Sequence, residues 1–200
     1  NADIVPAIVE ALRIPPLPGD DPRQTLISFL RPRDALLILD NLDHLLTPGN
    51  LDTVSGLLAA APELQIMVAS RTRLHLQSER VVEIDGLPYP SSLAEMTASN
   101  CAAIDLFVQC AQKQDAAFAL TPQNGDTVIR LCHLVDGMPL ALELAAAWIR
   151  TLTVAEVVEE IAHSVDFLTS TLRDAAPRHR SLRAVFDSSW RMLTAAEQDA

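Results

Sequence analysis

The chain has 200 residues, 49% of them hydrophobic, and a formal net charge of −11, which disfavours direct binding to nucleic acid or anionic lipid. This composition allows a buried core in one large or two small domains and excludes a disordered chain. No apolar run is long enough to span a membrane and no signal peptide is recognisable, so we expect a cytoplasmic protein without a membrane partner.

Two helices are expected at the start of the chain. The first covers residues 3–12, and the second begins at Pro22 with Asp21 as its N-cap. The proline-rich segment between them is predicted to be a loop, because clustered proline forbids a helix.

Strands follow these helices. Residues 35–39 (ALLIL) are continuously apolar, which predicts a strand buried on both faces. A helix with Asn50 as candidate N-cap comes next, and then a second apolar strand over residues 65–70. Strand, helix and strand form a βαβ unit, so the two strands should be parallel. Residues 81–84 offer a shorter third strand.

Beyond Pro90 the pattern changes to helices alone, which marks a domain boundary near residue 90. The expected helices are 99–114, 122–136 capped by Thr121, 139–150, 154–164 capped by Thr153, and 178–193, followed by a capping box of Thr194 and Glu197.

Charged residues follow both apolar strands. Asp40 ends the first strand and Ser70-Arg71 ends the second, so a parallel sheet brings them to one edge, where ligands bind in such folds. A carboxylate there suits Mg²⁺ and a guanidinium suits phosphate. The alternatives are an N-cap for Asp40 and a loop ion pair for Arg71.

Two residues after Asp40 offer further chemistry. Asp43 could orient an attacking water, and Asn41 could polarise the same water. The alternative for Asp43 is a surface acid at a helix start.

A second informative stretch is DGMPLALELAAAWI. Gly137 ends one helix and Pro139 opens the next. A plain helix-turn-helix corner explains both residues, but it does not explain why such a corner follows a sheet that resembles a nucleotide-binding one.

Four stretches taken in order resemble a known family. LLILDNLDHLL, IMVASRTRL, LCHLVDGMPLALELAAAWIR and RSLRAVFDSSWRMLTAAEQ resemble the NB-ARC-like ATPase of bacterial transcriptional regulators, a branch of the STAND-type signal-transduction ATPases. The resemblance covers nearly the whole chain; each motif is weak alone and the ordered set is more specific. It implies an α/β fold followed by an all-α fold. The implied parts are a partial P-loop NTPase sheet with Walker B, sensor and last strands (1–90), a helical domain (91–172) and the start of a winged helix (173–200).

The resemblance also implies roles for the site residues. Asp40 would be the Walker B carboxylate that holds Mg²⁺, with Asn41 where a second acid is usual and Asp43 as a candidate for that acid. Ser70 and Arg71 would read the terminal phosphate. Three residues of the helical domain, Gly137, Pro139 and Leu140, would pack over adenine and ribose.

One departure from the family bears on activity. The chain contains no G-x-x-x-x-G-K-[ST] loop, which would lie upstream of Asn1. That loop supplies most of the phosphate binding. We therefore expect ATP or ADP with Mg²⁺ to bind the parent protein, which would be a slow ATPase at most. We expect this fragment to bind the nucleotide weakly or not at all. In the family's strand order, residues 81–84 also lose their neighbouring strand. They should be detached, close onto 65–70, or pair with a second molecule at the exposed sheet edge.

Three functions remain open. The first is a nucleotide-dependent regulatory switch in a signalling protein or transcriptional regulator. The alternative is a catalytically silent protein-interaction scaffold with the same fold, which Asn41 makes possible. Direct nucleic-acid binding through the winged helix is disfavoured by the acidic charge, so nucleic acid is expected only at other domains of the parent.

Overall fold

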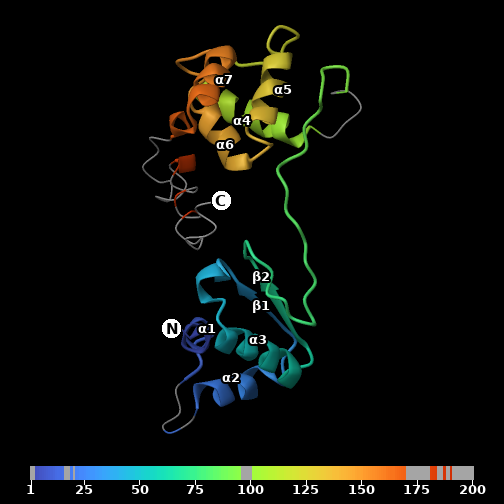
Figure 1. Ribbon diagram of the computed structural model, residues 1–200, viewed down its shortest axis with the longest axis vertical. Coiled ribbons are helices and arrows are strands. Elements are labelled where there is room, and N and C mark those ends of the chain that lie inside the picture. The colour runs from blue at the N-terminus through green and yellow to red at the C-terminus, as the bar shows by residue number, and fades with distance from the viewer. Residues whose placement is uncertain are drawn as a thin grey trace. The chain divides into compact units, whose positions relative to one another are not determined.

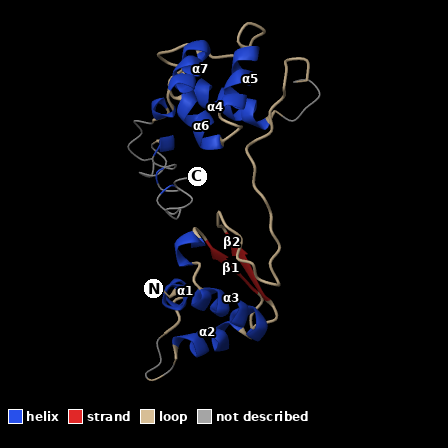
Figure 2. Cartoon of the chain, viewed as in Figure 1, coloured by secondary structure: helices blue, strands red, loops and turns tan. Residues whose placement is uncertain are grey.

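The computed structural model describes residues 3–15, 19, 21–95, 101–169, 181–183, 187 and 190 (Figure 1). The chain divides into two compact units, and the division falls between Val82 and Glu83 in the sequence. In the described residues, the first unit combines helices with two strands and the second unit is helical (Figure 2). This order agrees with the sequence pattern, while the P-loop NTPase assignment stays a prediction.

The sheet of the first unit has two parallel strands, β1 (Ala35–Leu39) and β2 (Leu64–Val68). They are joined by the helix α3 (Pro48–Ala60). The register runs from Ala35 opposite Leu64 to Leu39 opposite Val68. The parallel pairing of consecutive strands around one helix confirms the predicted βαβ arrangement.

Two further helices complete the first unit: α1 (Ile4–Ala11) and α2 (Pro22–Leu30). Each begins where an aspartate accepts a backbone N–H of the first turn, Asp3 for α1 and Asp21 for α2. This confirms the predicted cap of the second helix. The apolar sides of the three helices and one face of the sheet share a core, whose fully buried members include Ile4, Leu26 and Leu57.

The other face of the sheet is open in this structure. Leu36 and Ile38 of β1 are 56% and 62% exposed, and Met67 of β2 is 57% exposed. The prediction that residues 35–39 are buried on both faces is therefore wrong for this chain. A continuous apolar run indicates that both faces suit burial, but helices cover only one of them here.

Residues 81–84 do not form the expected third strand. Among the described residues the sheet has β1 and β2 alone, and Val82 and Ile84 are 78% and 93% exposed. The segment is therefore detached from the sheet, one of the three outcomes expected from the missing neighbour. An isolated strand gains no ladder hydrogen bonds, so the apolar sequence alone does not order it.

The second unit packs four helices: α4 (Ala102–Gln114), α5 (Gly125–Leu134), α6 (Pro139–Ala146) and α7 (Val154–His163). Helix α4 packs along α6, and α5 packs along α7. Their shared core includes the fully buried Phe107, Leu131, Leu142 and Val157. Phe107 meets Phe118 edge to face, with ring centroids 5.8 Å apart.

The segment of residues 86–93 lies against α5; we refer to it as the strap. Its first residue contacts the chain just beyond α5, because a Cβ on Gly86 would lie 1.9 Å from the carbonyl oxygen of Asp136. At its far end the Leu93 side chain covers Gly125, the first residue of α5. The strap therefore belongs to the helical unit, which explains why the division of the chain falls before the predicted boundary near residue 90.

Helix starts differ from the sequence expectation at two places. Helix α3 begins at Pro48, capped by Thr47, and the expected cap Asn50 is buried inside it and bonded to the backbone of Ile4 and Leu45. Helix α5 begins at Gly125, because a turn follows Thr121 and delays the helix, so Thr121 is not its cap. The predicted cap Thr153 is confirmed with a complete capping box.

Several expectations fall outside the described residues. The capping box of Thr194 and Glu197 belongs to this group, as do most residues of the expected helix 178–193 and of the expected winged-helix start (173–200). In the described part of the chain, no helix is long and apolar enough to cross a membrane.

Candidate functional site

Asp40 lies immediately after β1 at the carboxyl edge of the sheet, and its side chain is exposed. Backbone bonds continue the pairing past the strands, since Ala69 N donates to Leu39 O (2.9 Å) and Leu42 N donates to Ala69 O (3.2 Å). The turn that carries Asp40 is therefore held against the end of β2. Among the described residues, the Asp40 carboxylate has no hydrogen-bond or ion-pair partner.

Asn41 has a left-handed backbone conformation, with φ 57° and ψ 50°. This conformation is costly for most residues and is tolerated by glycine and asparagine. The backbone therefore explains an asparagine at this position without any catalytic role. Its predicted role in polarising a water stays untested.

Asp43 lies in the short 3-10 helix Leu42–Leu45 and bonds across to the end of β2. Its Oδ1 accepts from the Ser70 hydroxyl (3.0 Å) and from the Arg71 backbone N–H (2.7 Å). The Ser70 hydroxyl in turn accepts the Thr72 N–H at 3.2 Å. The sequence predicted Asp40 and the Ser70-Arg71 pair at one edge, and the structure adds Asp43, which bonds directly to the Ser70-Arg71 turn.

Arg71 extends from this turn with an exposed side chain. Its guanidinium has no hydrogen-bond or ion-pair partner in the described part of the chain, and it does not pair with Asp40. An unpaired guanidinium is a planar donor suited to phosphate oxygens. The edge thus presents an available carboxylate on one strand and an available cation on its neighbour.

The donor set at this edge fits Mg²⁺ only together with a ligand. Asp40 offers one carboxylate, and no group of three or more His, Cys, Asp or Glu side chains gathers as metal ligands anywhere in the described residues. Mg²⁺ commonly binds one or two carboxylates plus phosphate oxygens and water. The edge therefore suits a phosphate-bound magnesium ion rather than a metal held by protein alone.

The predicted adenine-side residues lie in the helical unit. Gly137 is left-handed (φ 62°), and a Cβ on it would lie 2.1 Å from the Leu87 carbonyl oxygen. Pro139 is the first residue of α6, and Leu140 is half-buried against the helical core. The strap therefore explains why residue 137 is glycine, and the nucleotide role of all three residues stays a prediction.

Two strap contacts that the sequence reading missed flank this corner. The Tyr89 hydroxyl donates to Asp136 Oδ1 (2.8 Å), and its ring meets His133 edge to face at 4.6 Å. The hydrogen bond to Asp136 is the main reason that the pKa of Tyr89 is raised above its ordinary value. No local sequence signal marks these contacts, because the Tyr89–Asp136 bond joins residues 47 positions apart.

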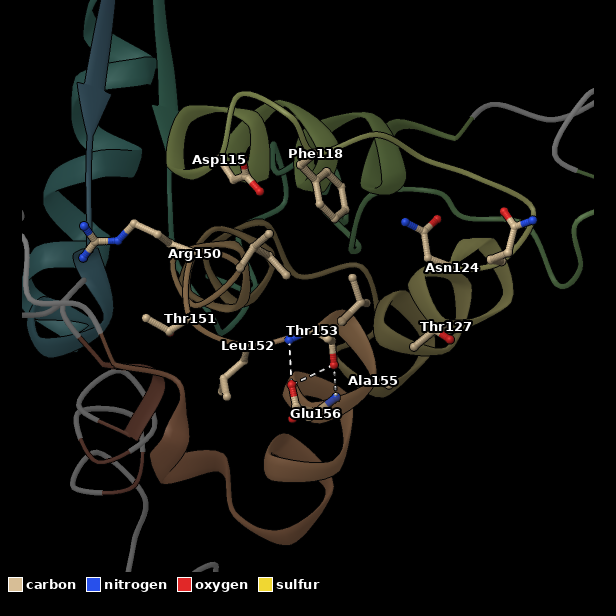
Figure 3. Close-up of a pocket in the computed structure, with 13 residues that line it drawn as sticks. Asp115, Phe118, Asn124, Thr127, Arg150, Thr151, Leu152, Thr153, Ala155 and Glu156 are labelled. Carbon is tan, nitrogen blue, oxygen red and sulfur yellow. Dashed lines mark hydrogen bonds between the residues drawn. The ribbon is translucent and has the colours of Figure 1, made fainter.

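A separate hollow of about 520 Å³ lies in the helical unit between the start of α5 and the turn before α7 (Figure 3). Its wall includes the capping box, in which the Glu156 carboxylate accepts the Thr153 N–H and hydroxyl at 2.8 Å. None of the predicted site residues lines it. Its charged groups are Asp115, Arg150 and Glu156, and the last of these is already bonded within the wall.

Comparison with known proteins finds relatives but no family model and no solved structure that match the chain. A Mycobacterium bovis protein named "Putative HTH-type transcriptional regulator" is 30% identical over 188 residues, which are 94% of this chain and 20% of that protein. A Mycobacterium tuberculosis protein with the same name matches equally well. An uncharacterised Mycobacterium bovis protein is 28% identical over 192 residues, 96% of this chain and 46% of that protein. The chain thus spans about a fifth of the length of the regulators to which it is similar.

Proposed function

We propose that this chain is the nucleotide-responsive core of a transcriptional regulator, in which ATP or ADP bound with Mg²⁺ selects between two states. The observation that carries the proposal is the sheet edge where Asp40 follows β1 directly and Arg71 lies in the turn after β2. Both side chains are exposed and have no hydrogen-bond or ion-pair partner among the described residues, so both are available to a ligand. Similarity to proteins named as HTH-type regulators supports the regulatory half of the proposal.

In this proposal each residue has a separate task. Asp40 holds Mg²⁺, which neutralises phosphate charge, and Arg71 binds the terminal phosphate oxygens. Gly137, Pro139 and Leu140 form the corner of the helical unit assigned to adenine and ribose. ATP and ADP differ by the terminal phosphate, so Arg71 is the group that distinguishes them.

The test uses the natural protein that contains this sequence and measures MgATP and MgADP affinities by calorimetry. Loss of a charged hydrogen-bond partner is worth about 1.5–3 kcal/mol, so Arg71→Ala should weaken MgATP binding about 10- to 100-fold and MgADP binding less. Asp40→Asn should reduce the dependence of binding on Mg²⁺. Asp34→Asn and Arg31→Ala, which change exposed residues before the amino end of β1, are matched controls. Unchanged affinities in both site variants would refute the proposal.

A second candidate function is an interaction scaffold that does not use nucleotide. The open sheet face with Leu36, Ile38 and Met67 favours it, because exposed apolar clusters on soluble proteins often mark contact sites. The two candidates differ in one measurement. If the chain is a scaffold, the natural protein that contains it should still regulate transcription when Asp40 and Arg71 are replaced, and should lose that regulation when Ile38 is replaced by Ser.

A further inference from the structure

The carboxylate of Asp43 joins the turns that follow the two strands. Asp43 lies three residues after Asp40, within the turn that the backbone bond from Leu42 to Ala69 already holds in place. Its Oδ1 takes one bond from a side chain, Ser70, and one from the backbone N–H of Arg71. The second bond, at 2.7 Å, is short for an N–H donor, as expected when the acceptor is a carboxylate.

This bond fixes the main chain of Arg71 and leaves its guanidinium without a partner among the described residues. An exposed arginine has several rotatable bonds, so where its guanidinium can reach depends first on where its backbone is held. In the described residues, no other side chain forms a hydrogen bond with the Arg71 backbone. Asp43 is therefore the side-chain group that determines the starting point of the Arg71 side chain.

We propose that Asp43 is a positioning residue: it holds the Ser70-Arg71 turn in register with Asp40 and so sets where Arg71 meets a terminal phosphate. The proposal rests on the function proposed above for Arg71. It replaces the role of Asp43 as the acid that orients an attacking water. It also makes the phosphate-reading turn dependent on the turn that carries the magnesium carboxylate.

The two roles of Asp43 make different demands on its chemistry. An acid that orients or deprotonates water needs its negative charge, whereas a positioning residue needs an oxygen that accepts two hydrogen bonds. An asparagine at position 43 keeps such an oxygen and loses the charge. The other carboxylate oxygen has no recorded partner in the described residues, so an amide nitrogen in its place breaks no contact. Asp43→Asn and Asp43→Ala therefore separate the two roles.

The first measurement follows amide hydrogen exchange in the 200-residue chain by NMR. Asp43→Ala should speed exchange of the Arg71 amide about tenfold or more, as expected for loss of one charge-assisted bond. Asp43→Asn keeps a weaker neutral acceptor and should speed exchange by a clearly smaller factor. Asp52→Ala is the matched control, because Asp52 is an exposed acid of the same unit whose carboxylate has no recorded contact. Amides of β1 and β2 report whether a variant has folded.

The second measurement compares MgATP and MgADP affinities in the natural protein that contains this sequence. Asp43→Asn should keep the ratio of the two affinities, and Asp43→Ala should move it towards the ratio in Arg71→Ala. If Asp43→Ala does not fold, Ser70→Ala removes one of the two donors and should shift the ratio in the same direction by a smaller factor.

Each outcome decides something. Equal loss in Asp43→Asn and Asp43→Ala would show that the charge matters and would overturn the positioning role, as would an unchanged Arg71 amide in Asp43→Ala. If Arg71→Ala leaves both affinities unchanged, the proposed function fails, while the exchange measurement still shows whether Asp43 holds the turn. Faster Arg71 exchange with an unchanged affinity ratio would refute the link between the turn and the phosphate.

Discussion

Gly86 and Gly137 face each other with their backbones in direct contact. The Leu87 N–H next to Gly86 donates to the Gly137 carbonyl at 2.8 Å. A Cβ on Gly86 would lie 1.9 Å from the Asp136 carbonyl oxygen, and one on Gly137 would lie 2.1 Å from the Leu87 carbonyl oxygen. The strap can therefore lie on the α5–α6 corner only because both residues lack a side chain.

This contact predicts a large effect of Gly86→Ala. The added methyl group meets a backbone carbonyl that cannot rotate away, so the strap must shift, and we expect a loss of about 3 kcal/mol in the stability of the helical unit. Gly49→Ala is the control, because nothing lies within 4 Å of its added Cβ. Urea unfolding followed by tryptophan fluorescence measures the helical unit, since both tryptophans, Trp148 and Trp190, belong to it. Equal stability of the two variants would contradict the strap contact.

The Tyr89–Asp136 hydrogen bond predicts a pH effect. The pKa of Tyr89 is raised, chiefly by this bond, so the folded state holds the phenol proton more tightly than the unfolded state does. The contribution to stability is then complete below the ordinary tyrosine pKa of about 10 and is lost as pH rises through the folded-state pKa.

Absorbance at 295 nm tests this directly, because Tyr89 is the single tyrosine of the chain. The native protein should titrate above the pH at which the urea-unfolded protein does. Asp136→Asn should lower the native midpoint, since it removes the charged acceptor. A native midpoint equal to the unfolded one would show that the bond does not form in solution.

The sequence predicted which residues follow the two strands better than it predicted which elements cover the faces of the sheet. Asp40 and Arg71 were assigned to one edge because parallel pairing follows from a short strand-helix-strand pattern, which is a local property. The exposure of Ile38 was not predictable in this way, since apolarity shows what a face can bury and not which element covers it. The bond from Asp43 to the Ser70-Arg71 turn was equally hidden, because it depends on the atomic fit of two turns 27 residues or more apart.

The open sheet face predicts unequal tolerance to substitution. Ile38→Thr replaces a β-branched side chain that is 62% exposed, so we expect a change in stability within about 0.5 kcal/mol. Leu57→Ala, in contrast, opens a cavity at a position that is 1% exposed and should cost about 3 kcal/mol. Far-UV circular dichroism during urea unfolding compares the two. A loss in Ile38→Thr as large as in Leu57→Ala would mean that the face is covered in solution.

The capping box of α7 predicts a loss of stability on substitution of Thr153 and a dependence of stability on pH through Glu156. Thr153→Ala removes the hydroxyl that accepts the Glu156 N–H and should cost about 1 kcal/mol, measured by tryptophan fluorescence in urea. The pKa of Glu156 is lowered by its bonds from the Thr153 backbone and hydroxyl. The ionised Glu156 carboxylate therefore contributes stability above the ordinary glutamate pKa, and this contribution is lost as pH falls through the folded-state pKa. Thr151→Ala, whose hydroxyl bonds only to a local carbonyl, is the control and should have a smaller effect.

Asn41 offers a test that separates backbone demand from chemistry. With φ at 57°, Asn41→Gly should keep the stability of the first unit within about 0.5 kcal/mol, and Asn41→Ala should lose about 1 kcal/mol, because alanine is strained in the left-handed region. Amide exchange of β1 and β2 measures both. If the Asn41 amide instead polarises a water, Asn41→Gly and Asn41→Ala should both lose hydrolysis, because both remove the amide. Asn41→Gly that retains both stability and any nucleotide hydrolysis of the natural protein would therefore assign this asparagine to the turn. A glycine variant that is stable but has lost hydrolysis would assign it to the chemistry.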